Sequence, residues 1–264
     1  MKFDKVMVPI DGSSLSEVAV DLALHSAGTF ATHLTFVFVL DPAAANSFGS
    51  VDPEIDLIRL KSEGKLALEI ASKKAVDAGV DHETVMMQGN PAQVITEMSK
   101  GQDMIIMAIA GKTGLGAGRI GSTAKKVIEN CFCPILTIKS GSSKITDILL
   151  PVSKENMAAI DVAIETAKRI DGRITVMSIK SKKTSNASEV AKSVTDKCAA
   201  AGVKVDTYVA EGNPLDSIVG QSGKYDLVIM GVEKLGGLQE ILHGGLTERV
   251  VTLASCPVTV VRDV

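Results

Sequence analysis

Residues 103–130, DMIIMAIAGKTGLGAGRIGSTAKKVIEN, decide the fold that we expect for this chain. Their uncharged run, residues 104–110, has the length and polarity of a strand buried on both faces of a sheet. Glycine occupies five of the eleven positions from Gly111 to Gly121, and helix-forming residues follow from Ser122 onward. The segment therefore predicts a strand, a glycine-rich loop and the start of a helix.

This order of elements is typical of an anion-binding site. The first turn of a helix carries four backbone N–H groups without an intrahelical partner and a partial positive charge. Glycines ahead of the helix let the backbone approach an oxyanion closely, and Ser122 and Thr123 add hydroxyl groups. We expect a phosphate group to bind here, and the alternative that the segment alone leaves open is a plain surface loop.

The same loop also matches the dinucleotide fingerprint, through Gly116, Gly118 and Gly121. That fingerprint requires its first glycine in a tight turn directly after the strand. The predicted strand ends several residues before Gly116. A dinucleotide is therefore the less favoured ligand.

Length and composition fit a folded protein with two domains of ordinary size. The chain has 264 residues, of which 45% are hydrophobic and 22% are charged, close to the averages of globular proteins. The net charge is −3, aromatic residues make up 3% and tryptophan is absent. Because nucleic-acid-binding surfaces need clustered positive charge or stacking rings, we expect no nucleic acid partner.

Features of secreted and membrane proteins are absent from the sequence. No uncharged apolar run approaches the roughly 18 to 20 residues of a membrane span, and Asp4 and Lys5 interrupt the N-terminal apolar stretch. We therefore expect a soluble cytoplasmic protein without a membrane partner. Metal-ligand spacing is also absent among the four cysteines, which are Cys131, Cys133, Cys198 and Cys256.

Several short motifs occur twice at a regular distance. The opening motif Val8-Pro9-Ile10-Asp11 is matched by Leu150-Pro151-Val152-Ser153, 142 residues later. An internal repeat of this length predicts two tandem domains of the same fold, which we place at residues 1–140 and 144–264. Three further motifs recur 123 residues later, namely Gly89-Asn90-Pro91, Ile106-Met107 and Cys133-Pro134.

Strand-like apolar runs alternate with helical segments in both halves. Alternation of this kind requires right-handed crossovers, so we predict an α/β fold. Each domain is expected to be a five-stranded parallel, doubly wound, Rossmann-like sheet with helices on both faces. The expected strands are residues 5–10, 34–40, 80–88, 103–110 and 135–138 in the first half and 145–152, 173–179, 203–210, 226–230 and 258–261 in the second.

Between the second and third strands, we expect a loop at residues 42–53 and a long helix at about residues 54–78. Leu66, Ile70 and Ala71 lie at helical spacing in it. Ligands of doubly wound sheets bind beyond the carboxyl ends of the strands, where the strand order reverses. Asp11 follows the first strand and Gly111 follows the fourth, so both can reach one crevice.

These residues resemble the universal stress protein family, and the similarity covers essentially the whole chain as a tandem pair of its domains. The opening VPIDGS, residues 8–13, is similar to the family's opening. The nucleotide-binding branch of the family uses Gly, two residues, Gly, nine residues, Gly, and then Ser or Thr. Here the pattern reads Ala108, Gly111, Gly121 and Ser122, with alanine in the first glycine position. The resemblance implies an adenine nucleotide alpha hydrolase-like sheet.

What the resemblance implies for the first domain is a site for ATP or AMP, with or without Mg²⁺. Asp11 would accept hydrogen bonds from the ribose or the base, and Pro9 and Val39 would face the adenine. The wall of the site would be formed by Gly89, Met107 and Ala108. The phosphates would be bound by Gly111, Lys112, Gly121, Ser122 and Thr123.

In the second domain the pattern is degenerate. Ser153 stands where the first domain has Asp11, Lys234 replaces the second glycine, and Gly245 replaces the hydroxyl residue. We expect the second domain to bind no nucleotide and to serve as an intramolecular dimerisation partner. The terminal strands of both sheets would otherwise leave exposed edges, and a homodimer of the whole chain is a further expectation.

A nucleotide-binding regulatory protein of the stress response, acting on a protein partner that the sequence does not identify, is the favoured function. The four histidines form no nucleophile–base pattern, so we expect no dedicated catalysis, although slow ATP hydrolysis is compatible with the sequence. Two alternatives stay open. One is an interaction module of the same fold that binds no nucleotide, and the other is an enzyme that uses a dinucleotide or a flavin.

Overall fold

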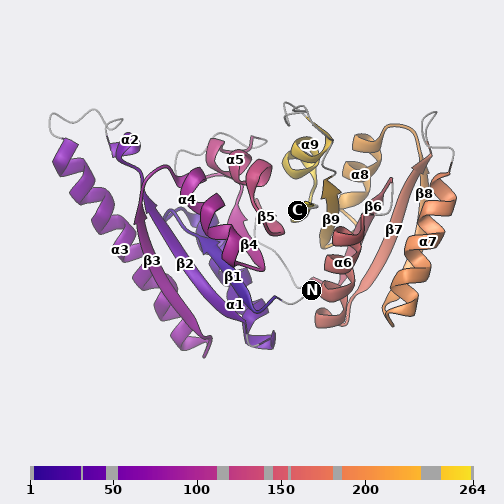
Figure 1. The fold of residues 1–264 in the computed structure, drawn as a ribbon, viewed down its shortest axis with the longest axis horizontal. Coiled ribbons are helices and arrows are strands. Elements are labelled where there is room, and N and C mark those ends of the chain that lie inside the picture. The colour runs from indigo at the N-terminus through magenta and orange to yellow at the C-terminus, as the bar shows by residue number, and fades with distance from the viewer. Residues whose placement is uncertain are drawn as a thin grey trace. The chain divides into compact units, whose positions relative to one another are not determined.

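The chain forms two compact units, Phe3–Ile138 and Lys139–Val264, in a computed structural model (Figure 1). The structure describes residues 3–30, 32–45, 53–111, 119–139, 145–153, 156–180, 186–232 and 245–262. Each unit contains a five-stranded sheet whose described strands pair in parallel. The two sheets confirm the predicted fold class.

In the N-terminal unit the strand order is β3-β2-β1-β4-β5. The chain adds strands on one side of β1 first and then returns to the other side, so the strand order reverses between β1 and β4. A ligand crevice is expected at this point. The strands are β1 (Lys5–Pro9), β2 (His33–Leu40), β3 (His82–Gln88), β4 (Met104–Ala108) and β5 (Ile135–Ile138).

Helices cover both faces of this sheet. The crossovers from β1 to β2 to β3 run in one direction and those from β3 to β4 to β5 in the other, so their helices lie on opposite faces. Helices α4 and α5 contact each other and lie in front of the strands in Figure 1. The helices are α1 (Ser14–Phe30), α2 (Pro42–Ala45), α3 (Pro53–Asp77), α4 (Pro91–Met98), the 3₁₀ helix η2 (Ser99–Gly101) and α5 (Ser122–Asn130).

The C-terminal unit repeats the plan, with strand order β10-β9-β6-β7-β8. Its strands are β6 (Asp147–Val152), β7 (Arg173–Lys180), β8 (Lys204–Glu211), β9 (Leu227–Val232) and β10 (Val258–Arg262). Its helices are α6 (Met157–Ile170), α7 (Ala187–Ala200), α8 (Pro214–Ser222) and α9 (Leu246–Leu253).

The repeated Gly-Asn-Pro motif has a structural explanation in both units. Gly89 (φ +149°) and Gly212 (φ +111°) follow the third strand of each sheet in backbone conformations that L side chains rarely adopt. Asn90 caps α4 by accepting the N–H of Gln93 at 3.2 Å, and Asn213 likewise caps α8. Proline at the first helical position needs no N–H partner. The motif therefore builds a strand-to-helix turn.

A second repeated feature is an aspartate that joins the amino ends of neighbouring strands. Asp103, before β4, accepts the N–H groups of Asp4 and Lys5 at 2.9 Å each. Asp226, which lies 123 residues later, accepts the N–H groups of Thr146 and Asp147 at 2.8 and 3.0 Å and the Thr146 hydroxyl at 2.8 Å. Both carboxylates thus satisfy backbone donors where the central strands begin.

The inward face of α3 cannot be read from the helical spacing of Leu66, Ile70 and Ala71. Leu66 and Ile70 are 58% and 40% exposed, whereas Leu68, Ala71 and Ala75 are buried. The reason is close approach between the helix and the sheet. Gly64 of α3 lies against Phe38 of β2, and a Cβ at position 64 would come 2.6 Å from its ring. The expected loop at 42–53 also contains one short helix, α2.

Of the described residues, none forms a helix that is long and apolar enough to cross a membrane. Within the same residues, no group of three or more His, Cys, Asp or Glu side chains is arranged to hold a metal ion.

Two mid-helix glycines give a matched test of the packing. Gly64→Ala should lower the free energy of unfolding by about 1–3 kcal/mol, because the added methyl group overpacks the Phe38 ring. Gly220→Ala in α8, where nothing lies within 4 Å of the added carbon, should raise it by about 0.4–1 kcal/mol. Urea titration followed by circular dichroism measures both. Equal effects of the same sign would contradict this account of α3.

A pH dependence follows from Asp226. Burial raises the pKa of this carboxyl, but the hydrogen bonds from Asp147 and Thr146 outweigh it and hold the pKa below the usual aspartate value. A lowered pKa stabilises the fold above the unfolded-state pKa, and this contribution is lost as the pH falls through the folded-state value. Asp226→Asn should therefore destabilise the protein at pH 7 and progressively less below about pH 4. A destabilisation that is independent of pH in urea titrations would contradict the assignment.

Candidate functional site

The candidate site lies at the carboxyl ends of β1 and β4, where the strand order reverses. The chain leaves β1 through Ile10, Asp11 and Gly12 and leaves β4 through Ile109 and Ala110 to Gly111. Ile10 donates its N–H to Val37 of β2 at 2.8 Å, and Ile109 donates its N–H to Ile138 of β5 at 2.9 Å. Both exits are thus anchored to neighbouring strands.

Asp11 is held in a defined position at the start of α1. Its Oδ1 accepts the backbone N–H of Ser13 at 3.0 Å and the Ser13 hydroxyl at 2.6 Å. The turn needs Gly12, whose φ is +75°. Ser13 in turn caps α1, because its Oγ accepts the N–H of Ser16 at 3.2 Å. The carboxylate is half-buried and orientated by its own turn.

The second carboxylate oxygen of Asp11 meets the loop after β4. A Cβ built on Gly111 would overlap Asp11 Oδ2 and lie 3.6 Å from Asp11 Cγ. The structure therefore brings Asp11 and Gly111 into contact at the switch point, as their positions after β1 and β4 led us to expect. Glycine at 111 is required as long as the carboxylate keeps this position.

The start of α5 closes the base of the glycine-rich loop. Gly121, the N-cap residue, donates its N–H to the carbonyl of Ile109 at 2.7 Å. A Cβ on Gly121 would lie 3.3 Å from that carbonyl oxygen, so this position is also tightly packed. Ser122 and Thr123 are the first two residues of α5, and the first-turn N–H groups have no acceptor within the helix. The helix dipole favours negative charge at this end.

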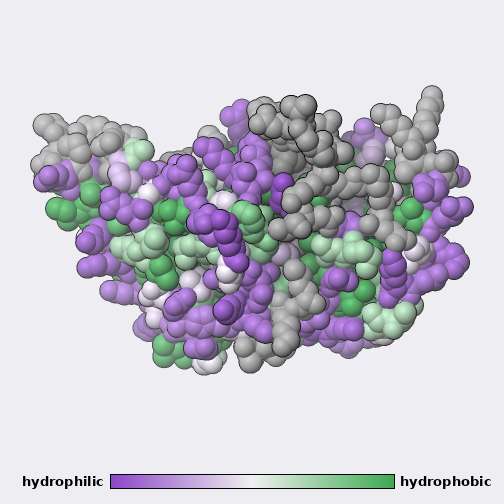
Figure 2. Space-filling view, viewed as in Figure 1, coloured by the Kyte–Doolittle hydropathy of each residue, from purple (hydrophilic) through white to green (hydrophobic). Residues whose placement is uncertain are grey.

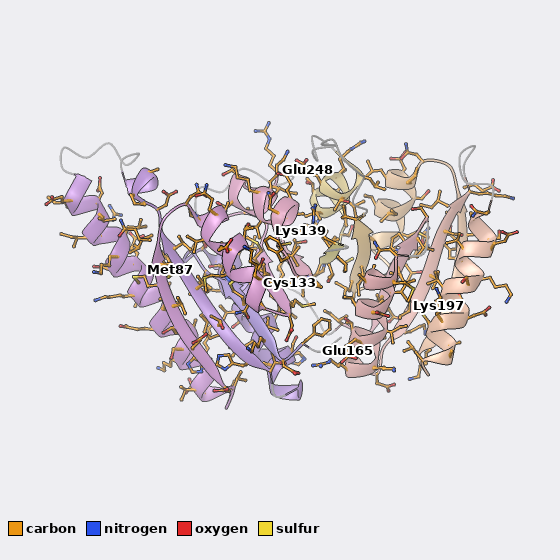
Figure 3. The ribbon with its side chains drawn as sticks, viewed as in Figure 1. Met87, Cys133, Lys139, Glu165, Lys197 and Glu248 are labelled. Carbon is orange, nitrogen blue, oxygen red and sulfur yellow. The ribbon has the colours of Figure 1, made fainter. Side chains whose placement is uncertain are left out.

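The remaining predicted site residues lie on the same edge of the sheet. Pro9 ends β1 and is buried, and Val39 is half-buried near the end of β2, where it pairs with Met87 of β3 (Figure 3). Gly89 follows β3 and donates its N–H to Leu40 at 2.9 Å. Met107 is 5% exposed and belongs to the core, while Ala108 ends β4 and is half-buried. Lys112 lies outside the described residues.

The corresponding edge of the C-terminal unit is built differently. Ser153 follows β6, and Gly231 of β9 occupies the position of Ala108 in the first unit. A Cβ on Gly231 would lie 2.5 Å from Nδ2 of Asn156. Asn156 caps α6 through Oδ1, which accepts the N–H of Ala159 at 2.9 Å, and its Nδ2 is buried without a hydrogen-bond partner in the described part of the chain. An amide side chain thus fills the space beside this glycine.

Sequence reasoning missed Asn156. The signal available was an N-cap residue directly before an apolar helix, which also describes Ser13 in the first unit. Nothing in that pattern shows that the longer side chain reaches the end of β9. Lys234, the other substitution in the second pattern, lies outside the described residues.

The histidines that the structure places lie away from this edge. His33 begins β2, and its Nδ1 lies 2.8 Å from Asp81 Oδ2. This hydrogen bond is the main reason why the pKa of the Asp81 carboxyl is lowered. His82 begins β3, where Nε2 lies 2.8 Å from Ser72 Oγ. Both are therefore at the amino ends of their strands. His25 lies within α1, and His243 is outside the described residues.

All four cysteines are buried, and none of them forms a disulfide. Burial raises the pKa of the Cys198 and Cys256 thiols to about 11. It raises the pKa of Cys133, which is labelled in Figure 3, further still. Thiols in such surroundings stay protonated and pack as small hydrophobic residues.

A double-mutant cycle tests the packing of Asn156 on Gly231. Gly231→Ala should destabilise the chain by about 1–3 kcal/mol through overpacking, and Asn156→Ala should cost about 1 kcal/mol through loss of the cap. The double variant should cost less than the sum, because the collision disappears with the amide. Additive costs in urea titrations would show that the two residues do not contact each other.

Comparisons with known proteins give the same assignment for both halves. The model of the Universal stress protein family matches residues 2–139 and again residues 144–262. A universal stress protein of Methanocaldococcus jannaschii is 36% identical over 142 residues, which cover 52% of this chain and 82% of the relative. Another, of Mycobacterium bovis, is 25% identical over 285 residues and is covered nearly end to end, at 98% of this chain and 97% of the relative.

Among solved structures, a universal stress protein from Archaeoglobus fulgidus matches with a TM-score of 0.83 at 16% identity, covering 99% of both chains. At this identity the likeness concerns the fold, and it extends over both units. The two matches of the family model together cover nearly all of the sequence. This chain therefore belongs to the universal stress protein family and carries two tandem copies of its domain.

Proposed function

We propose that this protein is a stress-response regulator whose N-terminal unit binds an adenine nucleotide, ATP or AMP. The observation that carries the proposal is the contact between Asp11 and Gly111 at the switch point. It places a carboxylate and a residue without a side chain at the edge where doubly wound sheets bind ligands. The resemblance of the loop to the nucleotide-binding pattern of the family supports the same ligand.

Each group of residues at this edge suits one part of the nucleotide. The Asp11 carboxylate accepts hydrogen bonds from ribose hydroxyls, and its Ser13 contacts keep it orientated for that role. Val39, which is half-buried, offers apolar surface to the adenine, whereas Pro9, the other residue expected there, is buried. The first turn of α5, with the hydroxyls of Ser122 and Thr123, suits the negative charge of the phosphates. A Mg²⁺ ion would arrive with the phosphates of ATP, as it commonly does in proteins.

In this proposal the C-terminal unit binds no nucleotide. Ser153 cannot match the two acceptor oxygens of Asp11, and the amide of Asn156 occupies the space beside Gly231. The second unit then serves as the built-in partner of the first, since two tandem domains fit an intramolecular pair. A protein partner would distinguish the nucleotide-bound form of the protein from the nucleotide-free form. No dedicated catalytic step is assigned to either unit.

One alternative is favoured by a specific observation. Ala108 places a Cβ at the end of β4, where the nucleotide-binding pattern has glycine. An interaction module that has lost nucleotide binding would keep the fold and tolerate this methyl group. The two functions are separated by whether the purified chain binds ATP or AMP at all.

Calorimetric titration of the full chain with ATP and with AMP tests the proposal. Asp11→Ala should weaken the binding by about tenfold or more, because a hydrogen bond to a charged group contributes roughly 1.5–3 kcal/mol. Asp216→Ala, an exposed first-turn aspartate of α8 in the C-terminal unit, is the matched control and should leave the affinity unchanged. Asp11 is a cleaner probe than Gly121, where any side chain also presses on Ile109.

Two outcomes would contradict the proposal. One is an unchanged affinity in an Asp11→Ala chain that keeps its circular dichroism spectrum. The other is the absence of saturable binding by either nucleotide to the unsubstituted chain, which would favour the interaction module.

A further inference from the structure

An open groove lies within the N-terminal unit, between α1 and α3, and no residue of α5 lines it. Its volume is about 140 Å³, which is below the range typical of drug-sized ligands and suits a smaller molecule. Its apolar lining is formed by Ile10, Val20, Leu66, Ala67, Ile70 and Ala71. We refer to it as the α1–α3 groove.

The wall that α3 contributes to this groove is exposed to an unusual degree for large apolar residues. Leu66 is 58% and Ile70 40% exposed. Figure 2 shows hydrophobic residues reaching the surface along α3, at the left edge of the view. Scattered exposed hydrophobic residues need no explanation, but here two of them line one concave site beside buried Val20 and Ile10. A ligand with an apolar body would cover them.

The charged residues around the groove leave a net negative charge at its mouth. Lys74 is neutralised by Asp21, with Nζ 2.7 Å from Oδ1. Glu63 forms an ion pair with Arg59, with Oε1 3.1 Å from Nε. Glu17 is exposed in the first turn of α1, and among the described residues no Lys or Arg forms an ion pair with it. Charge complementarity therefore favours a cationic group beside Glu17.

From the apolar lining and this carboxylate, we propose that the α1–α3 groove binds a small amphiphile with a cationic nitrogen, such as an alkylammonium ion. The alkyl part packs on Leu66, Ile70 and Val20, and the nitrogen lies beside Glu17. Ile10 and Gly12, which flank Asp11, also line the groove. An occupant thus touches the turn that orientates Asp11, although its binding does not depend on a bound nucleotide.

Titration of the full chain with n-octylammonium in the absence of nucleotide tests this proposal, with octanoate as a probe of equal chain length and opposite charge. Octylammonium should bind at one site and more tightly than octanoate. Ile70→Gln should weaken it by about fivefold or more, because part of the buried apolar area is lost. Val76→Gln is the matched control, since Val76 is 65% exposed on the same helix and does not line the groove.

A charge reversal tests the cationic group separately. Glu17→Lys should weaken octylammonium binding by about threefold and strengthen that of octanoate, as expected for an exposed charge pair. Glu189→Lys, at the first turn of α7 in the other unit, controls for the altered helix charge and should change neither affinity.

Three results would overturn the proposal. Octylammonium binding that is not saturable, or that Ile70→Gln leaves unchanged, would show that the groove is not the site. Equal affinities of the unsubstituted chain for the two probes would show that the ligand class is not cationic. Saturable binding with the expected dependence on Ile70 and Glu17 supports the proposal whether or not the chain binds ATP.

Discussion

The contact between the Asp11 carboxylate and the Cα of Gly111 is the constraint on which the candidate site depends. It exists because β1 and β4 are neighbours in the sheet although nearly a hundred residues separate them in the chain. Three residues make this contact possible. Gly111 allows the close approach, Gly12 adopts the positive φ that the turn needs, and Ser13 holds the carboxylate by hydrogen bonds. A loop with a side chain at 111 would displace the acceptor oxygen.

Comparison of the two units separates what the fold requires from what the site requires. Both sheets keep the same strand order, the Gly-Asn-Pro turn and the aspartate that joins the amino ends of the central strands. The carboxyl edges differ, because Ser153 stands where Asp11 does and an amide fills the space beside Gly231. The features that the units share are structural, and these differences lie at the edge where doubly wound sheets in general bind ligands.

Much of the fold could be predicted from the sequence, because the buried parallel strands appear as continuous apolar runs. The internal repeat also shows the same pattern of strands and helices in both halves, so each half supports the prediction for the other. The predicted start of the edge strand β3 lies two residues before the observed one, and that of β8 lies one residue before it. Periodicity alone did not identify the inward face of α3. Leu66 and Ile70 share a helical stripe with Ala71, yet the sheet packs against Ala71 and Gly64 because small residues allow closer approach.

The part of the candidate site that follows from the order of strands along the chain could be predicted. Asp11 and Gly111 follow neighbouring strands of a parallel sheet, so their meeting could be expected. The role of Asn156 and the α1–α3 groove could not, because both depend on how far side chains reach and how helices diverge. These are properties of tertiary packing, and they produce no periodic pattern of residues in the sequence.

The stoichiometry of adenine nucleotide on the full chain tests the central claim most directly, because the claim assigns binding to one unit and denies it to the other. Native mass spectrometry of the purified chain with saturating ATP should show one bound nucleotide for each chain. Two bound nucleotides would contradict the assignment of the C-terminal unit. A chain that remains free of nucleotide would contradict the role given to Asp11 and Gly111.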